Sequence, residues 1–142
     1  MANTSELRKV SEYTIKKTAE MLEVTLGRKS TRIGSIKSKT FDGVSPDENT
    51  VVKVVNHSGF TSGNNKPSAK IRNTFAECYF LSLTKAFYKY LVITDPEFYR
   101  IFEDESAGLL DSNNIKLLFI DLPEEYRAIV SRVTGEASKE MS

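Results

Sequence analysis

The chain has 142 residues, with 20 Lys and Arg against 19 Asp and Glu, one His and one Cys. This length corresponds to one domain that can bury a sizeable core. A composition of 39% hydrophobic and 27% charged residues is typical of globular proteins and argues against disordered and fibrous classes. One Cys excludes an internal disulfide, and one Cys with one His excludes a Cys/His zinc site. Any metal would be held mostly by oxygen atoms.

The chain also lacks the usual signals for membranes and secretion. No apolar run approaches the roughly 20 residues of a membrane span. The segment Met1–Arg8 has no apolar core of the kind that a secretory signal carries. We therefore expect a cytoplasmic protein without membrane contact. A single domain is expected over residues 1–134 and a frayed tail over residues 135–142, because the tail has little to bury.

The near-neutral total charge conceals an uneven distribution. Residues 1–100 carry 16 basic and 10 acidic side chains, whereas residues 101–142 carry 4 and 9. The most basic segment, residues 28–39, has five cations and no acid among Ser, Thr and Gly residues. Such a segment suits contacts with phosphates, and the alternative of equal weight is a solvated basic loop. Candidate nucleic-acid contacts are Arg28, Lys29, Arg32, Lys37, Lys39, Lys66, Lys70 and Arg72.

A first helix is predicted from about Val10 to Leu26. Its apolar residues recur at the spacing that places them on one face, and Gly27 is expected to end it. Extending that face by one turn toward the N-terminus reaches Glu12. A carboxylate at this inner edge is a candidate functional group, and the simpler alternative is a helix-end charge that reaches solvent.

Two extended segments, 39–44 and 50–56, are joined by the turn residues 45–49 and predict a hairpin. The second segment is β-branched on both faces, so we expect a central strand with both sides covered. Lys53 interrupts its run of valines. Either Lys53 is buried for a purpose, or it lies on an edge strand with its amine reaching water.

The remaining elements follow from turn and cap signals. A loop is expected over 60–67, then a helix from Ser68 as N-cap to about Lys85. Its predicted inner face comprises Ile71, Phe75, Cys78, Tyr79 and Ser82. A strand at 88–94, a short helix capped by Asp95, a strand at 115–120 and a helix from Pro123 to about Val133 complete the chain.

The predicted order is α, β, β, β, α, β, α, β, α. It indicates an α/β (α+β) protein with a central mixed β-sheet flanked by helices.

A leading helix with an inner carboxylate, a strand with Asp42 and a strand with Lys53 are followed by a helix and a further strand. This arrangement resembles the αβββαβ core of the restriction-endonuclease-like PD-(D/E)xK nucleases, and in character it is closest to type II restriction endonucleases. The segments 58–77 and 89–95 also look like those enzymes, which place a Gly/Ser loop and a basic helix start after the catalytic strand. The resemblance covers roughly residues 10–120.

The resemblance implies a Mg²⁺-dependent DNA endonuclease, with Mn²⁺ as a substitute ion. Asp42 would be the metal ligand, Lys53 the catalytic lysine and Glu12 the carboxylate that some members supply from the first helix. Carboxylates hold the ion beside the phosphate, and the lysine polarises the attacking water. Double-stranded DNA is the implied partner. A homodimer is expected, because one active site cuts one strand.

The chain departs from the family pattern at Val51, where a Glu or Asp would stand two residues before Lys53. Three accounts remain open. The carboxylate has moved, with Glu77 or Glu48 as candidates; the site is disabled by substitution; or the chain is a natural non-cleaving relative. This last account corresponds to the alternative function, a non-catalytic nucleic-acid-binding module on the same scaffold. A third reading is a protein-binding domain without nucleic acid.

Two further side chains are interpreted as structural. His57 could be a general base, but one His beside a Ser-Gly loop is more often a turn residue. Cys78 stands among aromatic residues and is expected in the core.

Overall fold

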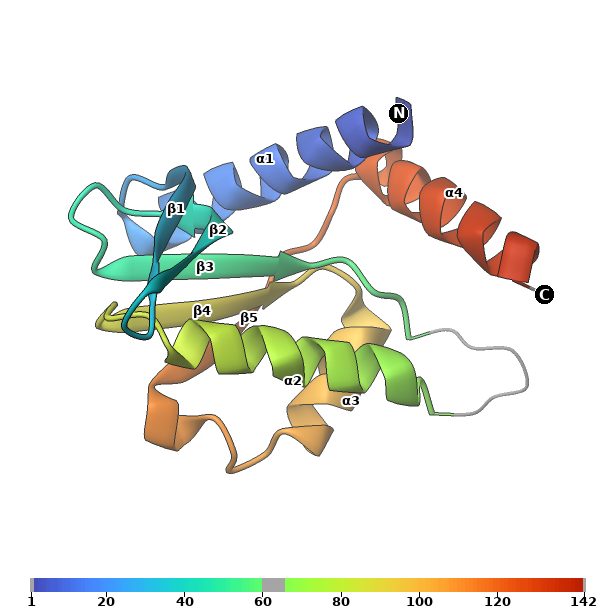
Figure 1. Ribbon diagram of the computed structural model, residues 1–142. Helices are drawn as coiled ribbons and strands as arrows, with labels where there is room; N and C mark the ends of the chain where they lie inside the picture. The colour runs from blue at the N-terminus through green and yellow to red at the C-terminus, as the bar shows by residue number, and fades with distance from the viewer. Residues whose placement is uncertain (1, 60–65, 142) are drawn as a thin grey trace.

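The computed structural model of the chain describes residues 2–59 and 66–141, with side chains over 5–59 and 66–133. Figure 1 shows a central sheet with helices on both sides. The helices are α1 (Ala2–Leu22), α2 (Ser68–Ser82), α3 (Pro96–Glu105) and α4 (Glu124–Met141). The strands are β1 (Gly27–Ile33), β2 (Lys37–Val44), β3 (Thr50–Val55), β4 (Tyr88–Ile93) and β5 (Ile115–Phe119). This order confirms the predicted α+β class.

The five strands form one mixed sheet in the order β1-β2-β3-β4-β5. β1, β2 and β3 are antiparallel neighbours, whereas β3, β4 and β5 run parallel to one another. The predicted hairpin of β2 and β3 is thereby confirmed, and β3 is the central strand. The alternative that placed Lys53 on an edge strand is wrong.

Helices cover the two faces of the sheet as separate layers. α1 lies on one face with α4 packed against it, and α2 and α3 lie on the other face (Figure 1). Along β3, Val51 and Val55 belong to the apolar cluster on the α2 side, whereas Val52 and Val54 belong to the cluster that contains Ile15 of α1. Because side chains alternate along a strand, Lys53 faces α2.

The basic segment 28–39 is not a loop. It forms β1, the following turn and the start of β2. The predicted order had three strands before the second helix but gave residue ranges for only two of them, and β1 is the third. Antiparallel pairing with β2 from Lys29 to Ile33, and at Gly27 beyond an irregularity, gives this polar backbone partners that a solvated loop lacks. The first helix correspondingly ends at Leu22 rather than Leu26. The chain turns at Glu23, whose φ is 55°, so Gly27 begins β1 instead of ending the helix.

The second helix also differs in detail from its prediction. Ser68 is its first residue, and the cap position is Pro67, without a side-chain cap bond. The helix ends at Ser82, and directly after it the Leu83 carbonyl accepts a hydrogen bond from Gly34 N of the β1–β2 turn. Tyr79 is 61% exposed rather than on the inner face. The buried residues of α2 are Ile71, Thr74, Cys78 and Leu81.

The C-terminal third forms the elements predicted for it, except that its last helix extends through most of the segment expected as a frayed tail. The Asp95 carboxylate caps α3 by accepting from Phe98 N at 2.8 Å. Helix α4 continues to Met141 rather than ending near Val133, and Ser142 lies outside the described residues. Most of the loop predicted at 60–67 also lies outside them. No helix in the described part of the chain is long and apolar enough to cross a membrane.

Candidate active site

Three elements bring one lysine and two carboxylates together. Lys53 on β3 places Nζ 3.6 Å from Asp42 Oδ2 on β2 and 3.8 Å from Glu77 Oε2 on α2. The side chain of Asp42 is only 10% exposed, and those of Lys53 and Glu77 are 26% and 24% exposed. Charges this far from solvent interact more strongly than surface ion pairs do. We define Asp42, Lys53 and Glu77 as the charged cluster.

Asp42 is positioned by a divergence of two strands. The pairing of β2 with β3 comprises Val44–Val51 and Gly43–Val52. At the next residue of β2, the Asp42 carboxylate accepts from Val54 N at 2.8 Å, in place of a main-chain carbonyl. The neighbouring Gly43 leaves room for α1, because a Cβ there would lie 2.9 Å from Ile15 Cδ1. The carboxylate is therefore fixed to the backbone of the residue that follows Lys53.

Asp42 also faces a hollow on the α1 side. Arg28 Nη1 lies 3.7 Å from Asp42 Oδ1, and Arg28 itself is largely exposed. Both residues line a hollow of about 860 Å³ along α1, and Glu12 lines it as well. Glu12 is exposed and takes no part in the ion pairs of the charged cluster. The structure therefore places Glu12 in the same hollow as Asp42 without joining it to Lys53.

Glu77 carries the most unusual atom of the cluster. Its Oε2 is buried and has no hydrogen-bond partner, although Lys53 lies nearby. Helix α2 packs its apolar side against the sheet, and Glu77 precedes the buried Cys78 at the edge of that side. Leaving a buried acceptor without a hydrogen bond costs free energy. A carboxylate oxygen held in this way is a candidate ligand for a cation.

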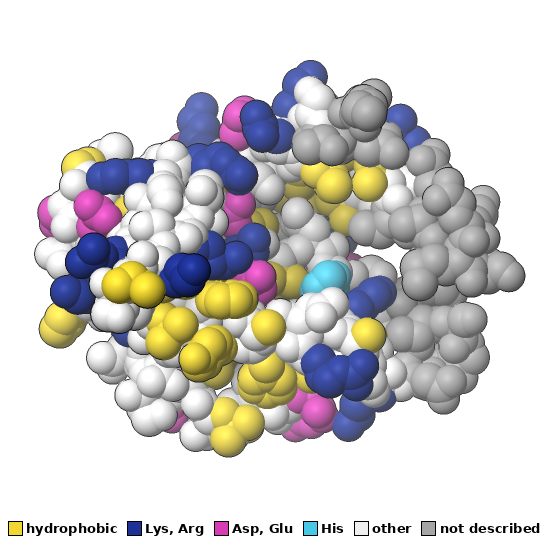
Figure 2. Space-filling view, viewed as in Figure 1, with side chains coloured by type: hydrophobic (Ala, Val, Ile, Leu, Met, Phe, Trp, Pro, Cys, Tyr) yellow, Lys and Arg dark blue, Asp and Glu magenta, His cyan; other side chains and the backbone are white. Residues whose placement is uncertain are grey.

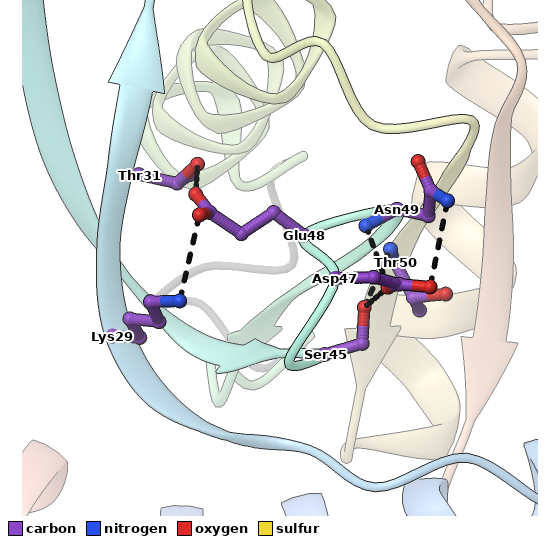
Figure 3. A network of polar contacts seen from close by, with 7 residues as sticks. All are labelled: Lys29, Thr31, Ser45, Asp47, Glu48, Asn49 and Thr50. Atoms are coloured by element: carbon purple, nitrogen blue, oxygen red, sulfur yellow. Dashed lines mark hydrogen bonds and ion pairs between the residues drawn. The ribbon is translucent and has the colours of Figure 1, made fainter.

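Of the two proposed relocations of the missing acid, the structure brings Glu77 to Lys53 and directs Glu48 elsewhere. Figure 3 shows Glu48 turned toward β1, where Oε1 accepts from Thr31 Oγ1 at 2.5 Å and Oε2 lies 3.4 Å from Lys29 Nζ. The hydrogen bond from Thr31, with the charge of Lys29 second, lowers the pKa of Glu48. Val51 is fully buried in the core.

The turn before β3 is held by its own polar side chains. Asp47 Oδ1 accepts from Ser45 Oγ at 2.7 Å and from Asn49 N at 3.0 Å, and Ser45 Oγ accepts from Thr50 N at 3.0 Å (Figure 3). The hydrogen bond from Ser45 is the main reason that the pKa of Asp47 is lowered. These bonds fix the entry into β3 and, with it, the start of the strand that carries Lys53.

The predicted nucleic-acid contacts on the β1–β2 hairpin divide between its two faces. Arg28 and Arg32 are exposed and alternate with the buried Thr31 and Ile33 along the end of β1. Ser30, Ser38 and Thr40 are also exposed. Lys29 pairs with Glu48, Lys37 is exposed at the start of β2, and Lys39 lies over the ring of Phe80. Arg28, Arg32 and the exposed Ser and Thr residues beside them thus form the basic surface of the hairpin, and Arg28 joins this surface to Asp42.

The second basic group lies elsewhere. Lys66 Nζ lies 2.8 Å from Glu105 Oε2, a hydrogen bond that raises the pKa of Lys66. Lys70 donates to the carbonyl of Ser58 at 2.9 Å. Arg72 is exposed on α2. Two of these three cations therefore already contribute to local structure, at the start of α2 and at its contact with α3.

His57, interpreted from the sequence as a turn residue, is near enough to Lys53 for the lysine charge to affect its pKa. It follows β3 by two residues, and its ring packs edge-on against Phe98 with centroids 5.6 Å apart. Burial lowers the pKa of His57, and the charges of Lys70 and Lys53 lower it further. The even spacing between Lys53 and His57 was the signal in the sequence that could have placed both side chains on the same face of an extended chain.

Cys78 is buried as predicted, and burial raises its pKa to about 12, so its thiol is unreactive.

The donor set decides which ions fit. Within residues 5–59 and 66–133, no group of three or more His, Cys, Asp or Glu side chains is arranged to hold a metal. The carboxylates paired with Lys53 are those of Asp42 and Glu77. Mg²⁺ usually keeps several water ligands and is bound by one or two carboxylates together with substrate phosphates. Two carboxylates therefore fit Mg²⁺ better than an ion that needs a complete set of protein ligands. Glu77 Oε2, which is buried without a hydrogen-bond partner, agrees with such a role.

Comparisons of the chain with protein-family models, with curated proteins and with solved structures find no match. The function is therefore inferred from the chemistry of the site.

Proposed function

We propose that the protein is a Mg²⁺-dependent endonuclease that hydrolyses phosphodiester bonds in DNA, with the charged cluster as its active centre. The observation that carries the proposal is the convergence of Asp42, Lys53 and Glu77 from β2, β3 and α2, within 3.8 Å of one ammonium group. A pair of carboxylates with a lysine is the set of groups that phosphodiester hydrolysis uses.

Asp42 and Glu77 would hold the Mg²⁺, for which Mn²⁺ could substitute. When bound, the ion supplies charge stabilisation at the phosphate and a lowered pKa for a coordinated water. The carboxylate of Asp42 is pre-positioned by its bond from Val54 N, so little reorganisation is needed. Glu77 contributes the buried Oε2 that has no hydrogen-bond partner.

Lys53 provides a positive charge between the two carboxylates. Its ammonium group can donate hydrogen bonds to a phosphate oxygen and stabilise negative charge that develops there. Arg28 is 58% exposed and can turn from Asp42 toward a neighbouring phosphate. Partial burial of Lys53 strengthens its electrostatic effect relative to a surface lysine.

The departure at Val51 has a specific meaning in this proposal. Glu77 supplies the carboxylate from α2, and Val51 serves as a core residue beneath the cluster. The basic surface of the hairpin, with Arg28 and Arg32, would contact the DNA backbone. Because one centre cuts one strand, we propose a homodimer for cleavage of a duplex.

A second candidate is a non-catalytic nucleic-acid-binding module. The observation that favours it is the lack, among the side chains that the structure describes, of a three-residue metal-binding group. Such a module would bind DNA with strong salt dependence through the hairpin surface. Its binding would survive removal of divalent ions and the loss of Asp42.

Plasmid cleavage separates the two candidates. Supercoiled DNA is incubated with Mg²⁺ or Mn²⁺ and the parent protein, the Asp42→Asn variant or the matched control Glu48→Gln, whose carboxylate faces β1 instead of Lys53. The nuclease proposal predicts cleavage by the parent and the control, loss of cleavage in Asp42→Asn, and loss on chelation. A parent that binds DNA but is silent with both metals would favour the binding module.

A further inference from the structure

Two neighbouring aromatic residues of α2, the exposed Tyr79 and the partly buried Phe80, follow Glu77 of the charged cluster along the helix. Tyr79 is 61% exposed, and its ring centroid is 5.9 Å from that of Phe80. Lys39 of β2 places Nζ 4.6 Å from the centre of the Phe80 ring. Figure 2 shows hydrophobic side chains gathered on this face of the molecule, with Lys and Arg side chains beside them. We define Lys39, Tyr79 and Phe80 as the aromatic platform.

The platform and the charged cluster share two elements. Phe80 follows Glu77 by three residues on α2, so the two side chains are neighbours on the helix surface. Lys39 precedes Asp42 by three residues on β2, a span of about 10 Å, and this odd spacing turns Lys39 toward α2 and Phe80 while Asp42 begins on the opposite face of the strand. A nucleic-acid strand whose phosphate lies at Lys53 would therefore have its next nucleotides within reach of the platform.

We propose that the aromatic platform stacks an unpaired nucleobase next to the scissile phosphate, with Lys39 contacting the adjoining phosphate. Aromatic side chains stack on bases of any sequence, and cations beside them track the backbone. This proposal rests on the proposed nuclease function and narrows it. The preferred substrate carries unpaired nucleotides at the cut, as in a single strand, a flap or a bulge.

Charge favours a nucleic acid over a second copy of the chain as the occupant. The exposed Lys37 lies on the same face of β2 as Lys39 and extends its positive charge beside the rings. A two-fold interface would place this surface against itself and bring like charges together. A polyanion, in contrast, complements the cations and covers the rings.

Binding without metal tests the platform independently of catalysis. Fluorescence anisotropy in EDTA would use a labelled 12-nucleotide DNA strand, its RNA counterpart, the matching duplex and an abasic strand of equal length. The variants are Tyr79→Ala and Tyr79→Phe. The matched control is Phe87→Ala, because Phe87 is 65% exposed and lines a different hollow, with Tyr90 and Lys116.

The proposal predicts that Tyr79→Ala weakens binding of the single strand about tenfold and leaves the abasic strand unchanged. Tyr79→Phe and Phe87→Ala should bind like the parent. The DNA and RNA strands separate the two sources of an unpaired base. The proposal is overturned if Tyr79→Ala binds the single strand as the parent does, or if it weakens the abasic strand equally. Conversion of a dimer to a monomer by Tyr79→Ala in sedimentation would assign the platform to a subunit interface instead.

The two proposals fail separately. Base-dependent binding that depends on Tyr79, in a protein that never cleaves DNA, would reject the nuclease and retain the stacking site. Cleavage that depends on Asp42, with equal rates for paired and unpaired substrates in the parent and in Tyr79→Ala, would retain the nuclease and reject the platform.

Discussion

Replacing Glu77 by Met should stabilise the protein in the absence of divalent ions. The carboxylate oxygen Oε2 is buried without a hydrogen-bond partner, so folding removes it from water with incomplete compensation. Methionine has a similar volume, suits a helix and carries no charge. Lys53 keeps its second partner, Asp42, 3.6 Å away, so the substitution leaves no isolated ammonium group.

The expected magnitude follows from two opposing terms. Removal of an unsatisfied buried acceptor gains about 1–3 kcal/mol, and loss of the partly exposed Lys53–Glu77 pair costs about 0–1 kcal/mol. The net gain in the free energy of unfolding is about 1 kcal/mol, which corresponds to a rise of about 4 °C in Tm for a chain of this size. The site would thus hold its carboxylate at the expense of stability, as functional sites often do.

Urea and thermal unfolding in EDTA would measure this difference. The matched control Glu125→Met removes an exposed carboxylate from the first turn of α4 and should lower the free energy of unfolding by at most about 1 kcal/mol, in the direction opposite to Glu77→Met. Adding Mg²⁺ at ten times its Kd should then stabilise the parent by about 1.4 kcal/mol and leave Glu77→Met nearly unchanged. A Glu77→Met protein that is less stable than the parent in EDTA would refute the reasoning.

Three further outcomes are expected. Val51→Glu should lower the free energy of unfolding by more than about 3 kcal/mol in urea, because it buries a charge in the core, and it should not increase cleavage. A Val51→Glu protein that is stable and cleaves faster than the parent would contradict this. The pKa of His57 is lowered in the folded protein, so its contribution to stability is complete above about pH 6.5 and is lost as the pH falls below that value. The urea midpoint should therefore fall more between pH 7 and pH 5 in the parent than in His57→Gln. Equal decreases in the two proteins would exclude this effect. Asp95→Ala loses bonds from Phe98 N and Gly59 N and should cost about 1–2 kcal/mol in thermal unfolding, whereas Asp95→Asn should retain most of that stability.

Local patterns predicted most of the fold. The β-branched run of β3 and the Asp-Pro start of α3 carry strong local signals, and both elements form where expected. β1 was missed because its residues 27–33 are basic and polar, so no apolar alternation marks them. Its conformation depends on pairing with β2, a contact between separate segments that propensity does not report.

The candidate site was predicted in part. The resemblance to the nuclease core implied that Asp42 and Lys53 act together, and Glu77 was one of two candidates for the missing acid; the structure brings all three within 3.8 Å of the Lys53 ammonium group. The sequence could not decide between Glu77 and Glu48, because the decision depends on which side of α2 faces the sheet and on the direction of the turn before β3. Tertiary packing sets both. Glu12 was predicted from the periodicity of α1, which indicates a helix face without indicating what lies opposite.

The central claim is that Asp42, Lys53 and Glu77 act together as one metal-dependent centre. Initial rates of plasmid cleavage, measured over a series of Mg²⁺ concentrations for the parent and for Glu77→Gln, test it most directly. The parent should cleave with a saturable dependence on Mg²⁺, and Glu77→Gln should lose that cleavage or require far more metal. Equal rates for the two proteins at every Mg²⁺ concentration would contradict the claim.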